Sequence, residues 1–450
     1  MFSLKYIWTL CLSGLACLVV LFIKLQWQTE IVINLNTNNN KYHKSSSLQL
    51  SDEKYLTFLP HSGLHNQRIA LINALVLAKT LNRTLILPEI NMGKANYWRE
   101  SKQLERQLSD CPTKPRGSVA GGCYGYSKYV PTTVANIFDL SSLSSLGIRV
   151  TQRKDMGLDY FEKYYGATPS DIVYIRDQSR FSYRIYDSKE NQMSMLNFEQ
   201  RIDMEDLDAR DEKIMVFGSL FSSFRLALEK PGWIWLWDYL FTEISFHHPT
   251  VIAQTLDIVG RLGGPGQFVS LHLRQGDGVF KAVMDQTVEQ VRLKLSETDD
   301  QNNIELDLET VQAIQAIDDP ASKLEKCLKI NSSPLSPLTS NIHPKLRLIY
   351  MATDAPDPRR SLPHLFNEFP CLFSLSDFPD VMANTLSATA LSPFVEDQQP
   401  SRFGPLFFPL IDAEVASYGS SFVGTKKSTF SKYISYRNRR FLAYYPNQKF

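Results

Sequence analysis

One stretch of this sequence, residues 55–88, constrains the fold more than any other because strand-like and helix-like patterns alternate within it. Residues 55–59 are apolar except for Thr57 and end at Pro60, and residues 66–80 carry apolar side chains at helical spacing. Residues 85–87 form a second short apolar run. A strand, a loop, a helix and a strand make a βαβ unit, whose two strands pair in parallel. The pattern therefore predicts an α/β fold.

A second series of the same kind starts near Pro249, a residue suited to the first turn of a helix. The further elements that we expect are strands at 268–273, 346–352 and 421–424 and helices at 359–366 and 428–437. Two clusters of βαβ units predict two Rossmann-like domains that face a cleft, over residues 54–245 and 246–450. Residues 294–345 are charged and rich in Ser and Pro, so a surface insertion is expected there.

The N-terminal residues differ from the rest. Residues 6–23 contain no charged side chain and lie between two lysines, a pattern typical of a single membrane-spanning helix. We expect residues 1–27 to be a short cytoplasmic tail with a signal anchor, and residues 28–53 to be a flexible polar stalk. A cleaved signal peptide is the alternative. The anchor predicts a single-pass type II protein of the Golgi or endoplasmic reticulum membrane, with its larger part in the lumen.

Charge and cysteine content narrow the possible partners and compartments. The formal net charge of +1 gives no basic surface that favours nucleic acid. Four of the six cysteines lie outside the apolar N-terminal segment, at positions 111, 123, 327 and 371, and an even number suits two disulfides in an oxidising compartment. Cys111 and Cys123 are close enough in sequence to close a loop. Asn82 and Asn331 begin glycosylation sequons.

Ligands of open parallel sheets bind beyond the carboxyl ends of the strands, so the residues after each expected strand are candidate site residues. The first such loop holds His61, Gly63, His65 and Asn66. A glycine turn that leads into a helix presents backbone N–H groups to an anion or a hydroxyl. The alternative is an ordinary strand–helix turn with Asn66 as the N-cap.

Arg274 follows the expected strand 268–273. Side chains alternate along a strand, so His272 and Arg274 should point to one face, where a guanidinium can bind a phosphate through two donors. The alternative is an ion pair between Arg274 and Asp277 that only closes the turn. Asp354 follows the next strand, and its carboxylate can accept hydrogen bonds from a base or a ribose, or else cap a helix.

The last of these loops, residues 424–430, places Ser428, Thr429 and Phe430 at the start of a helix. Hydroxyl and N–H groups in that position suit phosphate oxygens. Thr425 or Ser428 as a plain N-cap is the alternative.

Asp206 and Asp208 form the DxD pattern used by metal-dependent transferases. They lie in a run of mixed charge, residues 203–212, which is typical of an exposed loop. We therefore expect no metal and no other cofactor. The sequence also lacks the GxSxG elbow of α/β hydrolases.

Three segments together resemble the GDP-fucose protein O-fucosyltransferase family, in particular the sequences of its fungal members. They are PHSGLHNQRIALINALVLAKTLNRTLILP at 60–88, FVSLHLRQGD at 268–277 and SSFVGTKKSTFSKYISYR at 420–437. A fourth, less specific segment is LIYMATD at 348–354. The resemblance implies a GT-B fold, an inverting and metal-independent transfer, and GDP-fucose bound by the C-terminal domain.

The resemblance also implies roles for individual residues. Arg274 matches the family arginine that contacts the β-phosphate, and His272 and Asp354 match positions near the nucleoside. Residues 428–430 match the phosphate loop, and Asn66 matches the position that faces fucose and phosphate. Two departures stand out in this sequence: His65 replaces an Asn of the fungal sequences, and Gln275 replaces a second Arg of many members.

Together these patterns predict transfer of fucose from GDP-fucose to a Ser or Thr hydroxyl of a protein acceptor, with Arg274 stabilising the departing diphosphate. His61, His65 and Glu243 are the candidate bases, and Gly63 and His65 are expected to line the substrate site. Three alternatives are open: another nucleotide sugar as the donor, a glycan as the acceptor, or a non-catalytic member that only binds.

Overall fold

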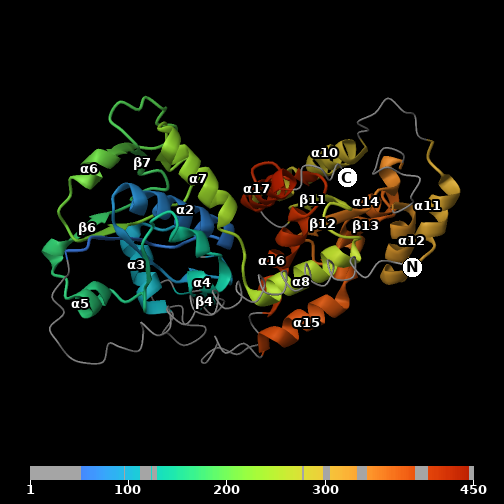
Figure 1. The fold of residues 1–450 in the computed structure, drawn as a ribbon, viewed down its shortest axis with the longest axis horizontal. Coiled ribbons are helices and arrows are strands. Elements are labelled where there is room, and N and C mark those ends of the chain that lie inside the picture. Colours follow the sequence, from blue (N-terminus) through green and yellow to red (C-terminus); the bar gives the residue numbers. More distant parts are fainter. Residues whose placement is uncertain are drawn as a thin grey trace, which may run out of the picture. The chain divides into compact units, whose positions relative to one another are not determined.

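The structure is a computed structural model that describes residues 52–95, 97–111, 123, 129–275, 278–296, 305–331, 342–390 and 404–444. Apart from residues 164–166, the described residues all belong to the larger of the two units into which the chain divides; Figure 1 shows their elements along the chain. The expected anchor at 6–23, almost all of the stalk, and Asp277 lie outside the described residues. Within the described ranges, no helix has the length and apolar character needed to cross a membrane.

The first sheet of the described residues has the strand order β5-β2-β1-β9-β6, and every neighbouring pair is parallel. Its strands are β1 (Tyr55–Phe58), β2 (Thr84–Leu87), β5 (Val150–Gln152), β6 (Ile172–Ile175) and β9 (Ile214–Phe217). The helix α2 (Leu64–Thr80) joins β1 to β2, so the predicted βαβ unit is confirmed. No periodic sequence pattern indicated β9, which pairs with both β1 and β6.

The helix α2 is buried from Gln67 to Ala78, including its polar positions. Arg68 donates from Nε to the carbonyl of Ile244 at 2.6 Å, and Asn73 donates from Nδ2 to the carbonyl of Leu220 at 2.8 Å. Buried polar groups need such partners, and these hydrogen bonds fix α2 against the backbone at Leu220 and Ile244. This is why an apolar helix tolerates an arginine in its core.

The start of α2 differs from the prediction. The N-cap is Gly63 and the helix begins at Leu64, so the backbone N–H of Asn66 donates to the carbonyl of Gly63. Asn66 as the N-cap was therefore wrong. The left-handed residue of the turn is Ser62, with φ of 69°, whereas Gly63 has φ of −74°.

Two small sheets and several helices complete this half of the chain. The small sheets are β10-β7-β8 (Leu226–Ala227, Tyr183–Tyr186 and Gln200–Asp203) and β3-β4 (Ile90–Asn91 and Pro131–Thr132). The helices are α3 (Ser101–Asp110), α4 (Val134–Ile137), α5 (Tyr160–Tyr165), α6 (Met204–Asp208) and α7 (Pro231–Glu243). The expected loop around Asp206 and Asp208 is partly helical because both residues lie on α6, and Asp206 pairs with Lys189 at 2.8 Å.

The second large sheet of the described residues has the order β13-β12-β11-β14, again all parallel. Its strands are β11 (Val269–Leu273), β12 (Ile349–Thr353), β13 (Leu372–Ser374) and β14 (Phe422–Gly424). Its longer helices are α8 (Pro249–Arg261), α10 (Met284–Ser296), α15 (Pro379–Ala390), α16 (Gly404–Ser417) and α17 (Thr429–Tyr444). The predicted α/β class with parallel sheets is confirmed.

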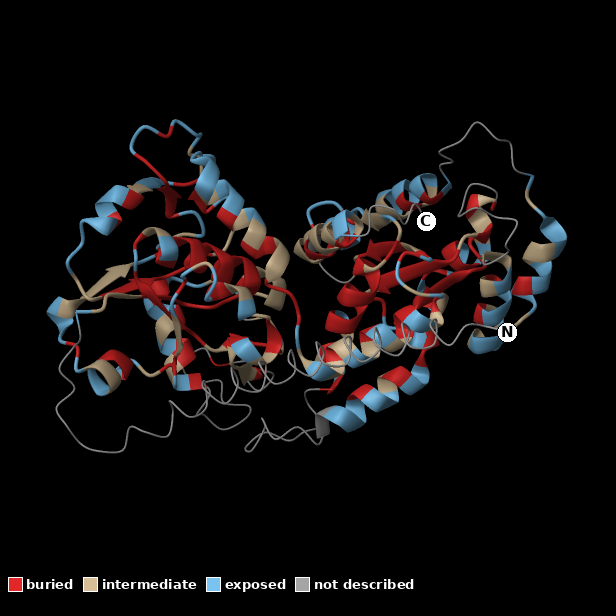
Figure 2. Cartoon of the chain, in the orientation of Figure 1, coloured by how far each residue is buried: buried red, intermediate tan, exposed pale blue. Residues whose placement is uncertain are grey.

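Both faces of this second sheet are covered. Leu271 and Met351 belong to one apolar cluster with Val291 of α10, whereas Tyr350 and Ala352 belong to another with residues of α8 and α16. Alternate residues of a strand point to opposite faces, so β12 contributes to both clusters. Figure 2 shows the buried residues concentrated in the strands and on the inner sides of the helices.

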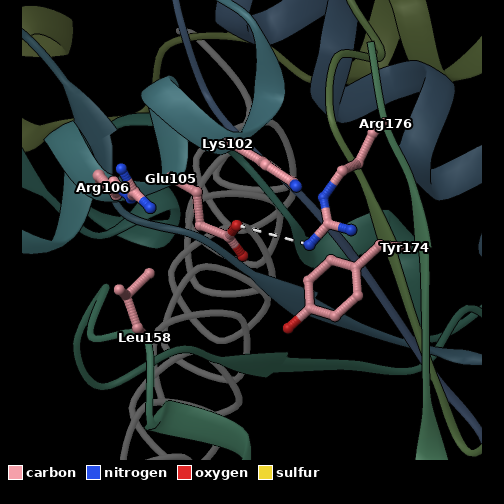
Figure 3. A pocket seen from close by; sticks show the side chains of 6 residues that line it. All are labelled: Lys102, Glu105, Arg106, Leu158, Tyr174 and Arg176. Atoms are coloured by element: carbon pink, nitrogen blue, oxygen red, sulfur yellow. Dashed lines mark ion pairs between the residues drawn. The ribbon is translucent and has the colours of Figure 1, made fainter. Parts of the chain in front are cut away.

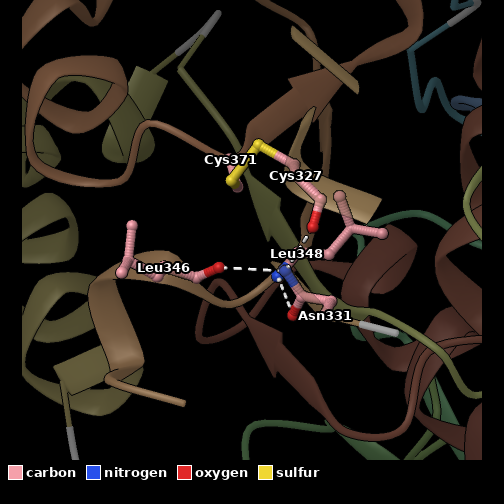
Figure 4. The surroundings of a disulfide bond; sticks show 5 residues. All are labelled: Cys327, Asn331, Leu346, Leu348 and Cys371. Atoms are coloured by element: carbon pink, nitrogen blue, oxygen red, sulfur yellow. Dashed lines mark hydrogen bonds between the residues drawn. A yellow bond between two sulfur atoms is a disulfide. The ribbon is translucent and has the colours of Figure 1, made fainter. Parts of the chain in front are cut away.

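The expected insertion at 294–345 contains two described helices, α11 (Leu308–Gln315) and α12 (Pro320–Asn331). Cys327 of α12 is buried and forms a disulfide with Cys371, with 5.7 Å between their Cα atoms. Asn331 donates from Nδ2 to the carbonyls of Cys327 and Leu346 and accepts from the backbone N–H of Leu348 (Figure 4). Part of the insertion is therefore built into the core and is not a surface addition.

The second disulfide joins Cys111 to Cys123, so the prediction of two disulfides is confirmed. The expected helix at 359–366 is divided into two short helices, α13 (Pro358–Ser361) and α14 (Pro363–Glu368), because Pro363 starts a second helix. Another short helix is α9 (Gly278–Ala282). The predicted boundary at residue 245 lies between α7 and α8. The two-domain division and the GT-B cleft stay predictions.

Candidate functional site

The carboxyl ends of β11 and β12 are joined by side-chain hydrogen bonds. The backbone N–H of Gln275 donates to Oδ1 of Asp354 at 2.7 Å, and Oγ1 of Thr353 donates to the carbonyl of Leu273 at 2.8 Å. Oδ2 of Asp354 lies 3.8 Å from Nε of Arg274. Asp354 is not a helix cap, since Asp357 caps α13. Its carboxylate instead orients the loop that carries Arg274.

The turn between β14 and α17 is fixed to β11 by Thr425. Its hydroxyl donates to the carbonyl of His272 at 2.8 Å and accepts from the backbone N–H of Arg274 at 3.1 Å. Ser428 behaves as the N-cap alternative expected, because its hydroxyl accepts from the backbone N–H of Ser431 at 3.3 Å. Lys427 in this turn has φ of 63°. Thr425 is a bridge between strands and not a cap.

His272 is buried beneath this turn. Its Nδ1 is hydrogen-bonded to Oγ of Ser431 at 2.6 Å, and its ring stacks on Phe430 at a centroid distance of 4.5 Å. Burial, with the charge of Arg274 as the smaller cause, lowers the pKa of His272 to about 3. The imidazole is therefore neutral at physiological pH and adds no charge beside Arg274.

Arg274 presents a cation at this edge. Its side chain is 31% exposed, and its guanidinium lies 5.5 Å from the ring of Phe280. The first turn of α17 lies close to Arg274, since Thr425, four residues before the start of this helix, accepts a hydrogen bond from the backbone N–H of Arg274. A guanidinium and a helix N-terminus at one sheet edge make an arrangement that can bind a phosphate.

The first turn of α2 contributes a second group of residues. The ring of His65 contacts Phe430 at 4.8 Å, Tyr433 at 5.2 Å and Phe246 at 5.5 Å. Phe430 thus touches both His65 and His272, so the structure brings the predicted residues of α2, β11 and α17 together. Burial, followed by the charge of Arg68, holds the pKa of His65 well below its usual range.

Several polar atoms in this group are buried without a partner. Among the described residues, neither ring nitrogen of His65 nor Oδ1 of Asn66 has a hydrogen-bond partner. A buried polar atom without a partner is costly in a folded protein and often marks a functional position. A ligand with hydroxyl groups can supply the missing hydrogen bonds.

His61 lies at the end of β1 in a separate network. Its Nε2 is hydrogen-bonded to Oγ of Ser219 at 2.6 Å, and its Nδ1 to Oγ of Ser62 at 2.8 Å. The N–H of Ser219 donates to Asp177, whose carboxylate lies 3.3 Å from the guanidinium of Arg225. Burial, then the charge of Arg225, lowers the pKa of His61 to about 4. Burial raises the pKa of Asp177 to about 6.

The remaining predicted residues are placed differently. Gly63 precedes α2, and a Cβ at this glycine would have no atom within 4 Å. Glu243 ends α7 and pairs with Arg440 at 2.6 Å. No contact among the described residues links Glu243 or His61 with Arg274. The part of the chain that the structure describes holds no cluster of three or more metal-binding side chains.

Sequence analysis missed Ser219, Asp177 and Ser431 as members of these networks. Ser219 follows the apolar run Ile214–Phe217 and a glycine, the same signal that identified the loop after β1. Asp177 follows β6 in the same way. The rule of examining strand ends would have found both, had β6 and β9 been recognised.

Known proteins resemble parts of this chain. A model of the GDP-fucose protein O-fucosyltransferase family matches residues 55–111. O-fucosyltransferase 6 of Arabidopsis thaliana is 27% identical over 75 residues, which are 17% of this chain. The match spans 13% of the length of that relative. The predicted resemblance to the family is confirmed over the segment that holds His61, Gly63, His65 and Asn66.

Solved structures of low sequence identity also match. The crystal structure of POFUT1 in complex with GDP-fucose is 12% identical, with a TM-score of 0.38, and the match covers 86% of this chain and 95% of that one. Fucosyltransferase NodZ from Bradyrhizobium is 13% identical, with a TM-score of 0.37 over 85% of this chain and 93% of that one.

Proposed function

We propose that this protein is an inverting, metal-independent glycosyltransferase of GT-B arrangement that transfers fucose from GDP-fucose to a Ser or Thr hydroxyl of a protein acceptor. The family match over residues 55–111 supports the reaction class. The observation that carries the proposal is the edge formed by β11, β12 and β14. There Arg274, Asp354 and Thr425 are held together by hydrogen bonds and an ion pair.

On this proposal, the edge binds the diphosphate of the donor. Cleavage of the bond between the sugar and the nucleotide leaves negative charge on the diphosphate. Arg274 stabilises that charge through its guanidinium, and the first turn of α17 adds N–H groups and the helix dipole. His272 is neutral, so it does not attract the diphosphate in place of Arg274. Its hydrogen bond to Ser431 instead positions the first turn of α17.

The sugar and the acceptor lie, on the same proposal, toward the first turn of α2. Oδ1 of Asn66 and the ring nitrogens of His65 are the buried polar atoms that fucose hydroxyls would satisfy. The acceptor hydroxyl attacks the sugar from the face opposite the diphosphate. The base is His61, His65 or Glu243, and the carboxylate of Glu243 lies 2.6 Å from the guanidinium of Arg440.

The test is release of GDP from GDP-fucose by the purified protein, measured with EDTA present. We expect Arg274→Ala to lower turnover by about 10²–10³-fold, the usual loss for one group that stabilises a developing anion. Arg274→Lys should recover part of the loss. Arg360→Ala, at an exposed position of α13, is the matched control. Unchanged turnover in a folded Arg274→Ala protein would overturn the proposal.

The donor is tested separately by thermal shift. Ligands that bind only the native state raise the unfolding temperature. We expect GDP and GDP-fucose to stabilise the protein more than UDP-sugars do. If only a different nucleotide sugar stabilises the protein, that sugar becomes the proposed donor and the transferase proposal stays. Binding without turnover would favour a non-catalytic member of the family.

We also propose that the protein is anchored in the Golgi or endoplasmic reticulum membrane by residues 6–23, with the rest in the lumen. The two disulfides support an oxidising compartment. Protection of the C-terminal part from protease in sealed microsomes is expected, and its digestion without detergent would contradict this orientation.

A further inference from the structure

A pocket of about 320 Å³ opens between α3 and the end of β6 (Figure 3). It is lined by Lys102, Glu105 and Arg106 of α3, Tyr174 and Arg176 at the end of β6, and Leu158. The three residues of α3 are spaced three and four apart, so they share one face of the helix. None of the lining residues belongs to the donor edge around Arg274.

The charge of the pocket is unbalanced. It contains three cationic side chains and one carboxylate, in a chain whose formal net charge is only +1. Glu105 lies 4.0 Å from Arg176, the outer limit for an ion pair. Lys102 and Arg106 form no ion pair in the described part of the chain. The guanidinium of Arg176 lies 4.2 Å from the centre of the Tyr174 ring, which holds it in place.

Burial weakens the one negative group. Removal of Glu105 from water raises the pKa of its carboxyl group, although the neighbouring arginines act in the opposite direction. The pocket therefore keeps an excess of positive charge together with a fixed guanidinium. Such an arrangement favours a carboxylate or another small anion.

Hydrogen bonds connect this pocket to the network of His61. The N–H of Asp177, the residue after Arg176, donates to Oγ of Ser101, the residue before Lys102. Asp177 also accepts from the N–H of Ser219, which is hydrogen-bonded to His61. In the sheet, β9 lies between β1 and β6, so the ends of β1 and β6 are two strand spacings apart, about 10 Å.

We propose that this pocket is an acceptor subsite that binds an Asp or Glu side chain of the protein acceptor. The inference rests on the proposed function and adds the chemistry of its acceptor. An extended peptide advances about 3.3 Å per residue, so a peptide whose acidic side chain lies in the pocket can place the residue three positions away beside His61, one of the candidate bases. A peptide, rather than a glycan, follows from the Ser or Thr acceptor of the proposed reaction.

The experiment measures binding of fluorescent Ser peptides to the full chain in detergent with GDP present. Peptides with Asp three positions from the Ser are compared with their Asn counterparts. We expect the Asp peptide to bind about tenfold more tightly, a typical gain for a charge-assisted contact, and added salt to reduce the difference. Equal affinities would overturn the subsite.

Variants test the pocket from both directions. Lys102→Glu with Arg106→Glu should abolish the preference for Asp, whereas Lys326→Glu on α12, an exposed matched charge reversal, should leave it intact. Glu105→Gln removes the competing carboxylate and should raise the affinity of the Asp peptide. An increase in affinity cannot result from misfolding, so failure of this variant counts against the subsite.

GDP release from GDP-fucose without acceptor separates this inference from the proposed function. If the subsite is wrong, wild type and variants release GDP alike and the peptides bind equally. If the proposed function is wrong, wild type does not convert GDP-fucose and water to GDP and fucose, whatever the peptides do. A sulfated oligosaccharide that binds through Lys102 and Arg106, without discrimination between the peptides, would overturn the peptide as the ligand.

Discussion

Arg225 directly precedes β10 and Arg274 directly follows β11, but the environments of the two guanidinium groups differ. Arg225 is 1% exposed, and its guanidinium donates to the carbonyls of Tyr183, Arg180 and Phe221 and pairs with Asp177. Arg274 is 31% exposed and lies 3.8 Å from Asp354. The first guanidinium is bound on all sides by the fold, whereas the second can still reach an anion. An arginine at a sheet edge is therefore a candidate for chemistry only when solvent can reach it.

The largest expected effect separates these two arginines. Arg225→Met leaves Asp177 as a buried charge without its cation, so we expect a loss of about 3–5 kcal/mol in the free energy of unfolding. Arg274→Ala should change that free energy little while turnover falls. Urea unfolding of both variants checks the contrast. Asp177→Asn combined with Arg225→Met should regain part of the loss, and equal destabilisation by the two single variants would remove the distinction.

Thr425→Val tests whether the donor edge depends on its bridging hydroxyl. The change leaves the N–H of Arg274 and the carbonyl of His272 without their partner, and such losses cost about 1–3 kcal/mol. The affinity for GDP should fall with the stability because the loop of Arg274 loses its anchor. Calorimetry and GDP titration measure both. Thr287→Val, on α10, is the control, and a GDP affinity equal to wild type would show that Arg274 is held by other contacts.

The pH dependence of stability compares His61 and His272, two buried imidazoles whose pKa values are lowered by different amounts. The folded pKa values of His61 and His272 are lowered to about 4 and about 3, below the ordinary value of 6.5. As the pH falls below about 6.5, the unfolded chain binds protons that the folded chain does not, so stability decreases. Asp177 acts in the opposite direction between about pH 4 and 6, because its folded pKa is raised.

Unfolding temperatures measured from pH 7 to pH 4 should therefore fall, and the fall should be smaller in His272→Asn and in His61→Asn. His272 has the lower pKa, so its replacement should flatten the profile more at the acid end. A profile that is unchanged in both variants would show that these imidazoles are protonated in the native state.

The smallest expected effect concerns the two sequons. Asn82 is exposed, with Oδ1 accepting from Arg149 at 3.1 Å, whereas both ends of the Asn331 amide are used in the core. If the chain enters the secretory pathway as proposed, one glycan should be attached, at Asn82. Asn82→Gln should abolish the mobility shift that endoglycosidase causes. A shift that survives in this variant would contradict the assignment.

The sequence predicted elements wherever a single local pattern decides the structure. β1, α2, β11 and β14 appear within a few residues of their expected positions because their apolar runs are bounded by Pro, Gly or charged residues. β12 starts later than expected, at Ile349, because Pro344–Leu346 forms a 3₁₀ turn. β9 was missed because a four-residue apolar run carries too little periodicity to be distinguished from a core loop.

The candidate site was predictable only in part, for the same reason. Arg274, His272 and Asp354 follow strands that the pattern identifies. The partners that set their chemistry, such as Ser431 for His272, come from segments more than a hundred residues away, and only the packed fold brings them together. Burial also decides the pKa values of His61 and His65, and burial depends on the whole chain.

The helix α12 has a consequence for attempts to shorten this protein. A deletion of residues 308–331 would leave Cys371 as a lone thiol, take Ile314 and Leu324 out of the apolar cluster, and strand the N–H of Leu348 just ahead of β12. Those losses fall on the sheet that carries Arg274 and Asp354. A segment that looks dispensable in the sequence therefore supports the sheet that carries the candidate site, and a shortened protein must retain it.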